Sequence, residues 1–206
     1  MTSPLVRLIK DRVNGRVVSI TRTTQPSNVP LLTVAKTQLA IGSSDTTHDV
    51  LLQRLIDAAV QYVENAARRS MFDQGWTLVL DSFPDEDFID LYMPPVKTVS
   101  SFTTYDYLDA ADTTFNKYSV DVNGTRVLLN YGYQWPVNLR TNSAVKIVYT
   151  TGYGTSAAAL PPTLVQAVML LVGQWFANRD ASGCGVTAEM ANSVTSILGL
   201  ERILRI

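Results

Sequence analysis

The chain offers few side chains that could carry out catalysis or bind a metal. It contains one histidine, His48, and one cysteine, Cys184. A zinc centre needs about four ligands and a nucleophile needs a neighbouring base, so these two residues support neither. Because His48 follows Thr46 and Thr47 and precedes Asp49, we expect it to be a surface or helix-capping residue.

The sequence Gly152-Tyr153-Gly154 resembles only part of a phosphate-binding loop. It lacks a third glycine and leads through small residues to Pro161-Pro162 instead of directly into a helix. The tryptophans Trp76, Trp135 and Trp175 do not alternate with basic residues, so we expect core or interface anchors and not base-stacking platforms. The sequence therefore predicts a protein that is not an enzyme and has no metal site and no cofactor.

Residues 81–112 form a strongly acidic segment. They contain one cation, Lys97, and eight carboxylates, which gives a net charge of −7. The carboxylates are Asp81, Asp85, Glu86, Asp87, Asp90, Asp106, Asp109 and Asp112. Carboxylate oxygens bind hard divalent cations, but Asp85-Glu86-Asp87 has neither the ligand spacing nor the glycine of a calcium-binding loop. A solvated turn is therefore the preferred interpretation.

The first 30 residues carry the opposite charge. They contain five cations and one carboxylate, a net charge of +4. Basic segments approach phosphates or acidic protein surfaces. The predicted arm contacts are Arg7, Lys10, Arg12 and Arg16. We predict a short hairpin in which Asn14-Gly15 turns the chain between residues 6–9 and 16–20, and the alternative is a flexible arm that becomes ordered only on assembly.

The secondary structure that would position the charged segments and His48 begins with a helical segment at residues 33–70. Its apolar residues recur at intervals of three or four and its polar residues occupy the other side, as in an amphipathic helix. Glu64 and Arg68 both fall on the polar side, in the order that favours an ion pair. Three residues are candidates to cap the start of its long helix: Asp45, Thr46 and Thr47.

A second helical segment, residues 161–179, has almost no polar face. Apolar side chains cover nearly its whole circumference, so every side must be buried, either at the centre of one core or at a subunit interface. A bilayer needs roughly 20 apolar residues, and this shorter run is interrupted by two glutamines, so no membrane association is expected. The predicted interface or core residues are Leu171, Trp175 and Phe176.

The composition favours the subunit interface. Charged residues make up 17% of the chain, the formal net charge is −1 and the mean hydropathy is +0.08. Soluble monomers usually contain roughly 25% charged residues, so an assembly subunit fits better. With 206 residues the chain is long enough for one or two domains with a real core. The single cysteine and the absence of a leader sequence predict a cytosolically made, reduced protein.

Between the two helical segments the hydrophobic period changes from 3.6 to two, which is typical of strands. Predicted strands cover residues 76–80, 88–92, 96–102, 118–122, 125–129 and 144–150. Asn123-Gly124 is predicted to form a type I′ turn, because these residues tolerate positive φ. We expect a small, mostly antiparallel sheet inserted between helices.

The order and spacing of several landmarks resemble the head-tail connector (adaptor) proteins of tailed double-stranded DNA phages. The landmarks are residues 32–39 (LTVAKTQL), residues 56–64 (IDAAVQYVE) with Arg69 just beyond, residues 93–96 (MPPV), residues 149–154 (YTTGYG), residues 160–162 (LPP) and residues 174–179 (QWFANR). They are packing and turn residues that span residues 31–180, so their shared order carries the resemblance.

The resemblance implies an α+β fold: a helical bundle body with an inserted small antiparallel β-sheet domain, an extended N-terminal arm and a C-terminal tail segment. The corresponding parts are a basic arm at 1–30, a helical body at 31–72 and 156–180, the β domain at 73–155, and a C-terminal linker and portal-binding segment at 181–206. The arm precedes the usual start of the family pattern, so its contacts are the part that the resemblance does not supply.

The function that the resemblance implies is structural. Such proteins form a homo-oligomeric ring, commonly of twelve subunits, in the neck of the virion below the portal protein. The ring extends the DNA channel and supports stopper or tail-completion proteins, and it is assembled in the host cytoplasm. The residues expected to contact the portal are Leu198, Leu200, Ile203 and Leu204. The arm would then pack on a neighbouring subunit or on the portal.

The acidic segment gains a second interpretation in such a ring. If residues 81–112 line the channel, their charge would repel double-stranded DNA and keep it mobile during transit. Two other structural roles remain open: another neck or tail-completion protein of the virion, and a cellular protein-binding module.

Overall fold

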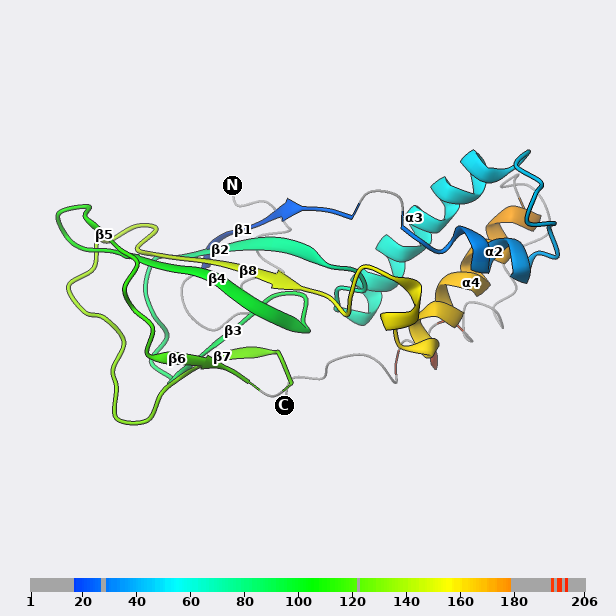
Figure 1. The fold of residues 1–206 in the computed structure, drawn as a ribbon. Helices are drawn as coiled ribbons and strands as arrows, with labels where there is room; N and C mark the ends of the chain where they lie inside the picture. The colour runs from blue at the N-terminus through cyan, green and yellow to red at the C-terminus, as the bar shows by residue number, and fades with distance from the viewer. Residues whose placement is uncertain are drawn as a thin grey trace. The chain divides into compact units, whose positions relative to one another are not determined.

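The computed structural model describes residues 17–26, 29–121, 123–178, 194, 196, 197 and 199. It has the predicted α+β class, with helices and two antiparallel sheets (Figure 1). The chain divides into two compact units: a β unit of residues 1–25 and 73–152, and a helical unit of residues 26–72 and 153–206. In the described part of the chain, no helix has the length and apolar character needed to cross a membrane.

The larger sheet of the β unit has the strand order β1-β2-β8-β4-β5. Its strands are β1 (Val17–Thr24), β2 (Gln74–Leu80), β8 (Val145–Thr151), β4 (Val96–Tyr105) and β5 (Ala111–Asp112). Burial alternates strictly along β2 and β8, so one face of each strand lies in the core. The register pairs core residues of both strands, such as Leu78 with Ile147.

A smaller sheet has the order β3-β7-β6, with β3 at Phe88–Asp90, β7 at Arg126–Leu129 and β6 at Tyr118–Val120. Ile89 and Val127 of this sheet belong to the same buried cluster as Leu78 and Ile147 of the larger sheet. The two sheets therefore share one hydrophobic core, which explains why short strands are stable here.

The hairpin of β6 and β7 is present, but its turn differs from the predicted one. The amide of Gly124 donates to the carbonyl of Asp121 at 2.8 Å, so Gly124 closes the turn and Asn123-Gly124 is not its central pair. Gly124 has a φ of +61°, and a Cβ atom there would lie 2.8 Å from the carbonyl oxygen of Val96. Both the backbone conformation and the close approach require glycine.

The end of the expected N-terminal arm is part of the sheet. Residues 17–24 form β1, an edge strand that pairs antiparallel with β2, with Val17 opposite Leu80. Hydrophobic periodicity relates only residues that are close in sequence. It could not predict this pairing, which joins segments about 60 residues apart. The predicted partner strand at residues 6–9 lies outside the described residues.

The helical unit contains α2 (Leu32–Gln38), α3 (Asp49–Ala67), the 3₁₀ helix η1 (Ala157–Ala159) and α4 (Pro162–Ala177). The three α-helices pack together around one buried cluster, but the described residues do not show the expected helical bundle body. The predicted segment 33–70 is interrupted after α2, where Ala40 has a φ of +55°. A non-glycine residue in this region ends a helix.

The start of α3 is stabilised differently from the prediction. Its N-cap residue is His48, which makes no side-chain capping hydrogen bond, and Asp45 instead accepts a hydrogen bond from the Thr47 amide at 2.9 Å. Asp49, in the first turn, forms an ion pair at 2.6 Å with Lys36 of α2. The Lys36 side chain is buried, so this ion pair links α2 to α3 and is partly shielded from solvent.

Candidate functional site

Several of the sequence landmarks meet at the C-terminal end of α3. Arg68 is its C-cap and has a left-handed φ of +59°, which turns the chain back. The returning amide of Met71 donates to the Glu64 carboxylate at 2.8 Å. Glu64 is 3% exposed, so its predicted place on the polar face is wrong. A buried carboxylate holds the turn because the chain brings an amide donor to it.

The landmark at residues 149–154 ends at the same place. The Arg69 guanidinium donates to the Tyr153 hydroxyl at 2.6 Å, and the Tyr153 amide donates to the carbonyl of Met71 at 3.0 Å. Phe72 and Gly154 form an isolated parallel bridge. These contacts join the end of α3 to the segment that follows β8.

Helix α4 has a buried face and a narrow open strip. The buried residues are Leu164, Ala167, Val168, Met169, Leu171 and Val172. The open strip consists of Gln166, Leu170, Gly173 and Ala177, which fall on one side of the helix at helical spacing. Gln166 and Ala177 are exposed, whereas Leu170 and Gly173 are partly exposed. A Cβ atom at Gly173 would meet nothing within 4 Å. The described residues therefore do not bury the helix on every side, and this strip is a candidate contact surface.

The three predicted residues of α4 have different environments. Leu171 is buried in the core, whereas Trp175 and Phe176 are half-buried and pack against its edge. The His48 ring meets the Phe176 ring edge-on, with 5.5 Å between the ring centroids. His48, at the start of α3, thus covers the aromatic side chain of Phe176 in α4.

The other predicted contact residues lie outside the described residues. These are Arg7, Lys10, Arg12, Arg16, Leu198, Leu200, Ile203 and Leu204. Within the C-terminal segment, Val194 is buried in the core of the helical unit and Ile197 packs against it. Part of the predicted tail segment thus contributes to the core of the chain itself.

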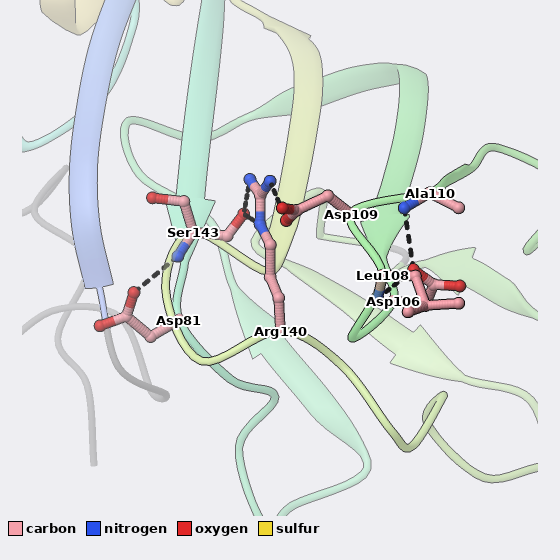
Figure 2. A network of polar contacts seen from close by, with 7 residues as sticks. All are labelled: Asp81, Asp106, Leu108, Asp109, Ala110, Arg140 and Ser143. Carbon is pink, nitrogen blue, oxygen red and sulfur yellow. Dashed lines mark hydrogen bonds and ion pairs between the residues drawn. The ribbon is translucent and has the colours of Figure 1, made fainter.

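A network of polar contacts ties together the loops at one end of the larger sheet (Figure 2). The Arg140 guanidinium donates to the carbonyl of Ser143 at 2.7 Å and contacts the Asp109 carboxylate at 3.3 Å. It also lies over the ring of Tyr105, 3.9 Å from the centroid. The amide of Ser143 donates to the Asp81 carboxylate at 2.7 Å.

Other carboxylates of the acidic segment hold turns or pair with cations. Asp106 accepts the amides of Leu108 and Ala110, both at 2.8 Å. Asp90 pairs with Arg126 at 2.7 Å. In the described residues, no group of three or more potential ligands could hold a metal ion. Because most of these carboxylates have structural partners, the acidic composition of the segment does not indicate a binding site by itself.

Hydrogen bonds also lower the pKa of one exposed carboxyl group here. The hydroxyl of Thr114 donates to Asp112 at 2.6 Å, and the amide of Thr114 donates to the same oxygen at 2.7 Å. These bonds favour the charged form, so the pKa of Asp112 lies below its ordinary value. The local turn is therefore best formed above acid pH.

An open groove of about 450 Å³ lies beside this network. Residues 81–84, which follow β2, and residues 135–141, which precede β8, line it. Phe83 and Trp135 stack with their ring centroids 4.7 Å apart, and the Trp135 indole donates to the carbonyl of Glu86 at 2.9 Å. Trp135 is thus an anchor within an aromatic cluster, as the sequence suggested.

Loops of the β unit expose several large apolar side chains, namely Tyr107, Leu108, Tyr131, Tyr133 and Val137. Tyr107 and Leu108 lie between β4 and β5, at one end of the sheet (Figure 1), and the others lie in the segment between β7 and β8. Large apolar side chains that are exposed are candidates for contact surfaces. The sequence could not predict that these side chains are exposed, because each lies in an irregular loop where no hydrophobic period indicates which side faces the core.

Solved structures with the same fold come from gene transfer agent (GTA) particles. A chain in the neck of an empty GTA particle, computed with C6 symmetry, is 23% identical, has a TM-score of 0.77 and covers 92% of this chain and 97% of that chain. A chain in the virion of a native GTA particle is 21% identical with a TM-score of 0.75 and the same coverage.

A third chain, in the neck of a native GTA particle computed with C12 symmetry, is 22% identical with a TM-score of 0.74 and again covers 92% and 97% of the two chains. At this level of identity the similarity shows a shared fold. No protein-family model and no curated protein matches the sequence.

Proposed function

We propose that this chain is a structural protein of a virion neck: a head-tail adaptor that forms a ring below the portal, extends the DNA channel and joins the head to stopper or tail proteins. The observation that carries this proposal is the similarity to GTA neck chains over nearly the whole of both proteins. The ring would contain twelve subunits, in keeping with the C12 symmetry of one of those necks.

Two features of the chain support an assembly. The described part of the chain covers the open strip of α4 only in part, although Leu170 packs against the edge of the core, and the loops of the β unit expose large apolar side chains. Surfaces of this kind are stabilised when another subunit covers them.

We further propose that the portal is bound by Leu198, Leu200, Ile203 and Leu204. The support is the family resemblance together with the apolar character of this segment. Replacing Ile203 and Leu204 by aspartate is expected to weaken portal binding by at least about tenfold, because burying such a side chain contributes about 1.5–3 kcal/mol.

The experiment combines the purified full chain with its cognate portal and counts subunits by mass photometry and negative-stain imaging. The expected result is a monomer that joins a twelve-fold ring on the portal. Val50→Asp is the matched control, because Val50 is an exposed apolar residue in the first turn of α3, where an acidic residue is tolerated. A stable dimer, or no response to the portal, would indicate a different neck or tail-completion protein.

A further inference from the structure

The groove beside the polar network combines an apolar floor with an acidic rim. Phe83, Trp135 and Leu139 contribute the apolar surface. Asp81 lines one side of the groove, and the acidic rim continues into Asp85, Glu86 and Asp87, which are exposed and follow the lining residues directly. The carbonyl of Glu86 accepts the Trp135 indole at 2.9 Å, which keeps this segment beside the groove. A ligand that fits such a surface alternates apolar and basic side chains.

Arg140 is the one cation among the residues that line the groove. Its guanidinium is held by the carbonyl of Ser143, the Asp109 carboxylate and the ring of Tyr105. Because these partners occupy its charge, Arg140 offsets the acidic rim only in part. The groove therefore favours a cationic occupant.

The first 16 residues of the same chain have the matching character. They contain four cations, Arg7, Lys10, Arg12 and Arg16, and one carboxylate, Asp11. The apolar residues interleaved with them are Leu5, Val6, Leu8, Ile9 and Val13. This segment carries a net charge of +3, so it complements the rim in sign and the floor in hydrophobicity.

The topology places the start of this segment at the groove. The chain enters β1 at Val17, which lies opposite Leu80, and Asp81 begins the groove directly after Leu80. Twelve extended residues reach up to about 40 Å, so residues 5–16 are long enough to cross it. Docking near the point of attachment also costs little loop-closure entropy.

We propose that residues 5–16 fold back into the groove between residues 81–84 and 135–141 of the same chain, beside the exposed carboxylates of residues 85–87. The basic side chains pair with the exposed carboxylates of the rim, and the apolar side chains cover Phe83 and Trp135. This docking does not depend on the proposed neck function. In this proposal the arm contacts its own chain, whereas the family resemblance led us to expect contact with a neighbouring subunit or with the portal.

Limited trypsin digestion of the full chain tests the proposal, because the arm itself contains cleavage sites after Arg7, Lys10, Arg12 and Arg16. Fragments are counted by mass spectrometry, and a synthetic peptide of residues 1–20 gives the rate for an undocked arm. We expect the full chain to be cut about tenfold more slowly than the peptide, because cleavage follows the population of the open form.

Neutralising the rim should remove this protection. The triple variant Asp85→Asn, Glu86→Gln and Asp87→Asn is expected to be cut within about twofold of the peptide rate. Asp85→Asn alone is compared with Asp73→Asn, which neutralises a carboxylate at the other end of β2 and should leave the rate unchanged. Continued resistance of Lys97, within the sheet, shows that each variant is folded.

The outcomes separate the occupants of the groove. A rate for the full chain equal to that of the peptide, or unchanged protection in the triple variant, would overturn the proposal. Protection that appears only as the protein concentration rises would assign the groove to the arm of a second copy and would also overturn it. Protection that is independent of concentration and lost in the triple variant supports it.

Discussion

At the scale of single residues, Tyr149 places a polar hydroxyl inside the hydrophobic core of the β unit. It lies on the central strand β8, is fully buried, and its hydroxyl exchanges hydrogen bonds with the backbone of Tyr92, both at 3.2 Å. Burial raises the pKa of Tyr149 above its ordinary value of 10.0. The hydroxyl is thus a neutral donor and acceptor that satisfies a loop backbone inside an apolar cluster.

Tyr149→Phe is expected to lower the free energy of unfolding by about 1–2 kcal/mol at neutral pH, because the backbone of Tyr92 loses its partner. The folded pKa is raised, so the contribution from this proton is fully present below about pH 10 and is lost as the pH rises further. Denaturant unfolding at several pH values checks both effects. Tyr131→Phe, at an exposed tyrosine, should change neither. An equal alkaline loss in wild type and Tyr149→Phe would contradict the assignment.

At the scale of elements, α4 separates core from candidate contact surface within one helix. Leu171 is 7% exposed and belongs to the core, whereas its neighbour Leu170 lies on the open strip with Gly173. Successive helical residues point about 100° apart, so two leucines next to each other in sequence can have different roles. The packing of the described residues thus explains the apolar character of the whole helix only in part.

Leu171→Asp and Leu170→Asp form a matched pair that tests this division. We expect Leu171→Asp to cost more than about 3 kcal/mol and to yield insoluble or unfolded protein, because a charge would be buried. Leu170→Asp should cost less than Leu171→Asp and retain the fold, while weakening ring formation, because Leu170 is partly exposed although it packs against the edge of the core. Thermal melts and mass photometry with the portal measure the two properties. A soluble, folded Leu171→Asp monomer would show that Leu171 is an interface residue.

At the scale of the whole molecule, the chain builds two compact units with separate hydrophobic clusters. The β unit combines residues 17–25 with residues 73–152, and the helical unit takes residues from both sides of that segment. Units with their own cores can open separately, since each buries its apolar surface independently.

Hydrogen exchange after a core truncation in each unit tests this independence. Leu78→Ala in β2 and Leu52→Ala in α3 each remove a fully buried side chain and are expected to cost about 2–5 kcal/mol. Leu78→Ala should speed exchange across the β unit and leave α3 and α4 protected, and Leu52→Ala should do the opposite. Simultaneous loss of protection in both units would indicate a single cooperative structure.

The local elements of this protein could be predicted from its sequence. The pattern of residues 76–80 and 144–150 predicted β2 and β8, and the apolar run after Pro161 predicted α4. These features follow from the periods of strand and helix, which any short window of sequence displays. The lack of histidine and cysteine clusters was also visible directly, and so was the separation of basic and acidic segments.

Only the tertiary structure decided which distant residues meet. It paired Val17 with Leu80, formed one groove from residues 81–84 and 135–141, and buried Glu64 against the amide of Met71. Glu64 follows the helical period of a polar face, yet the left-handed turn at Arg68 returns a donor to it. Such contacts depend on the path of the whole chain, because strand pairing and turn geometry bring together groups that no local period relates.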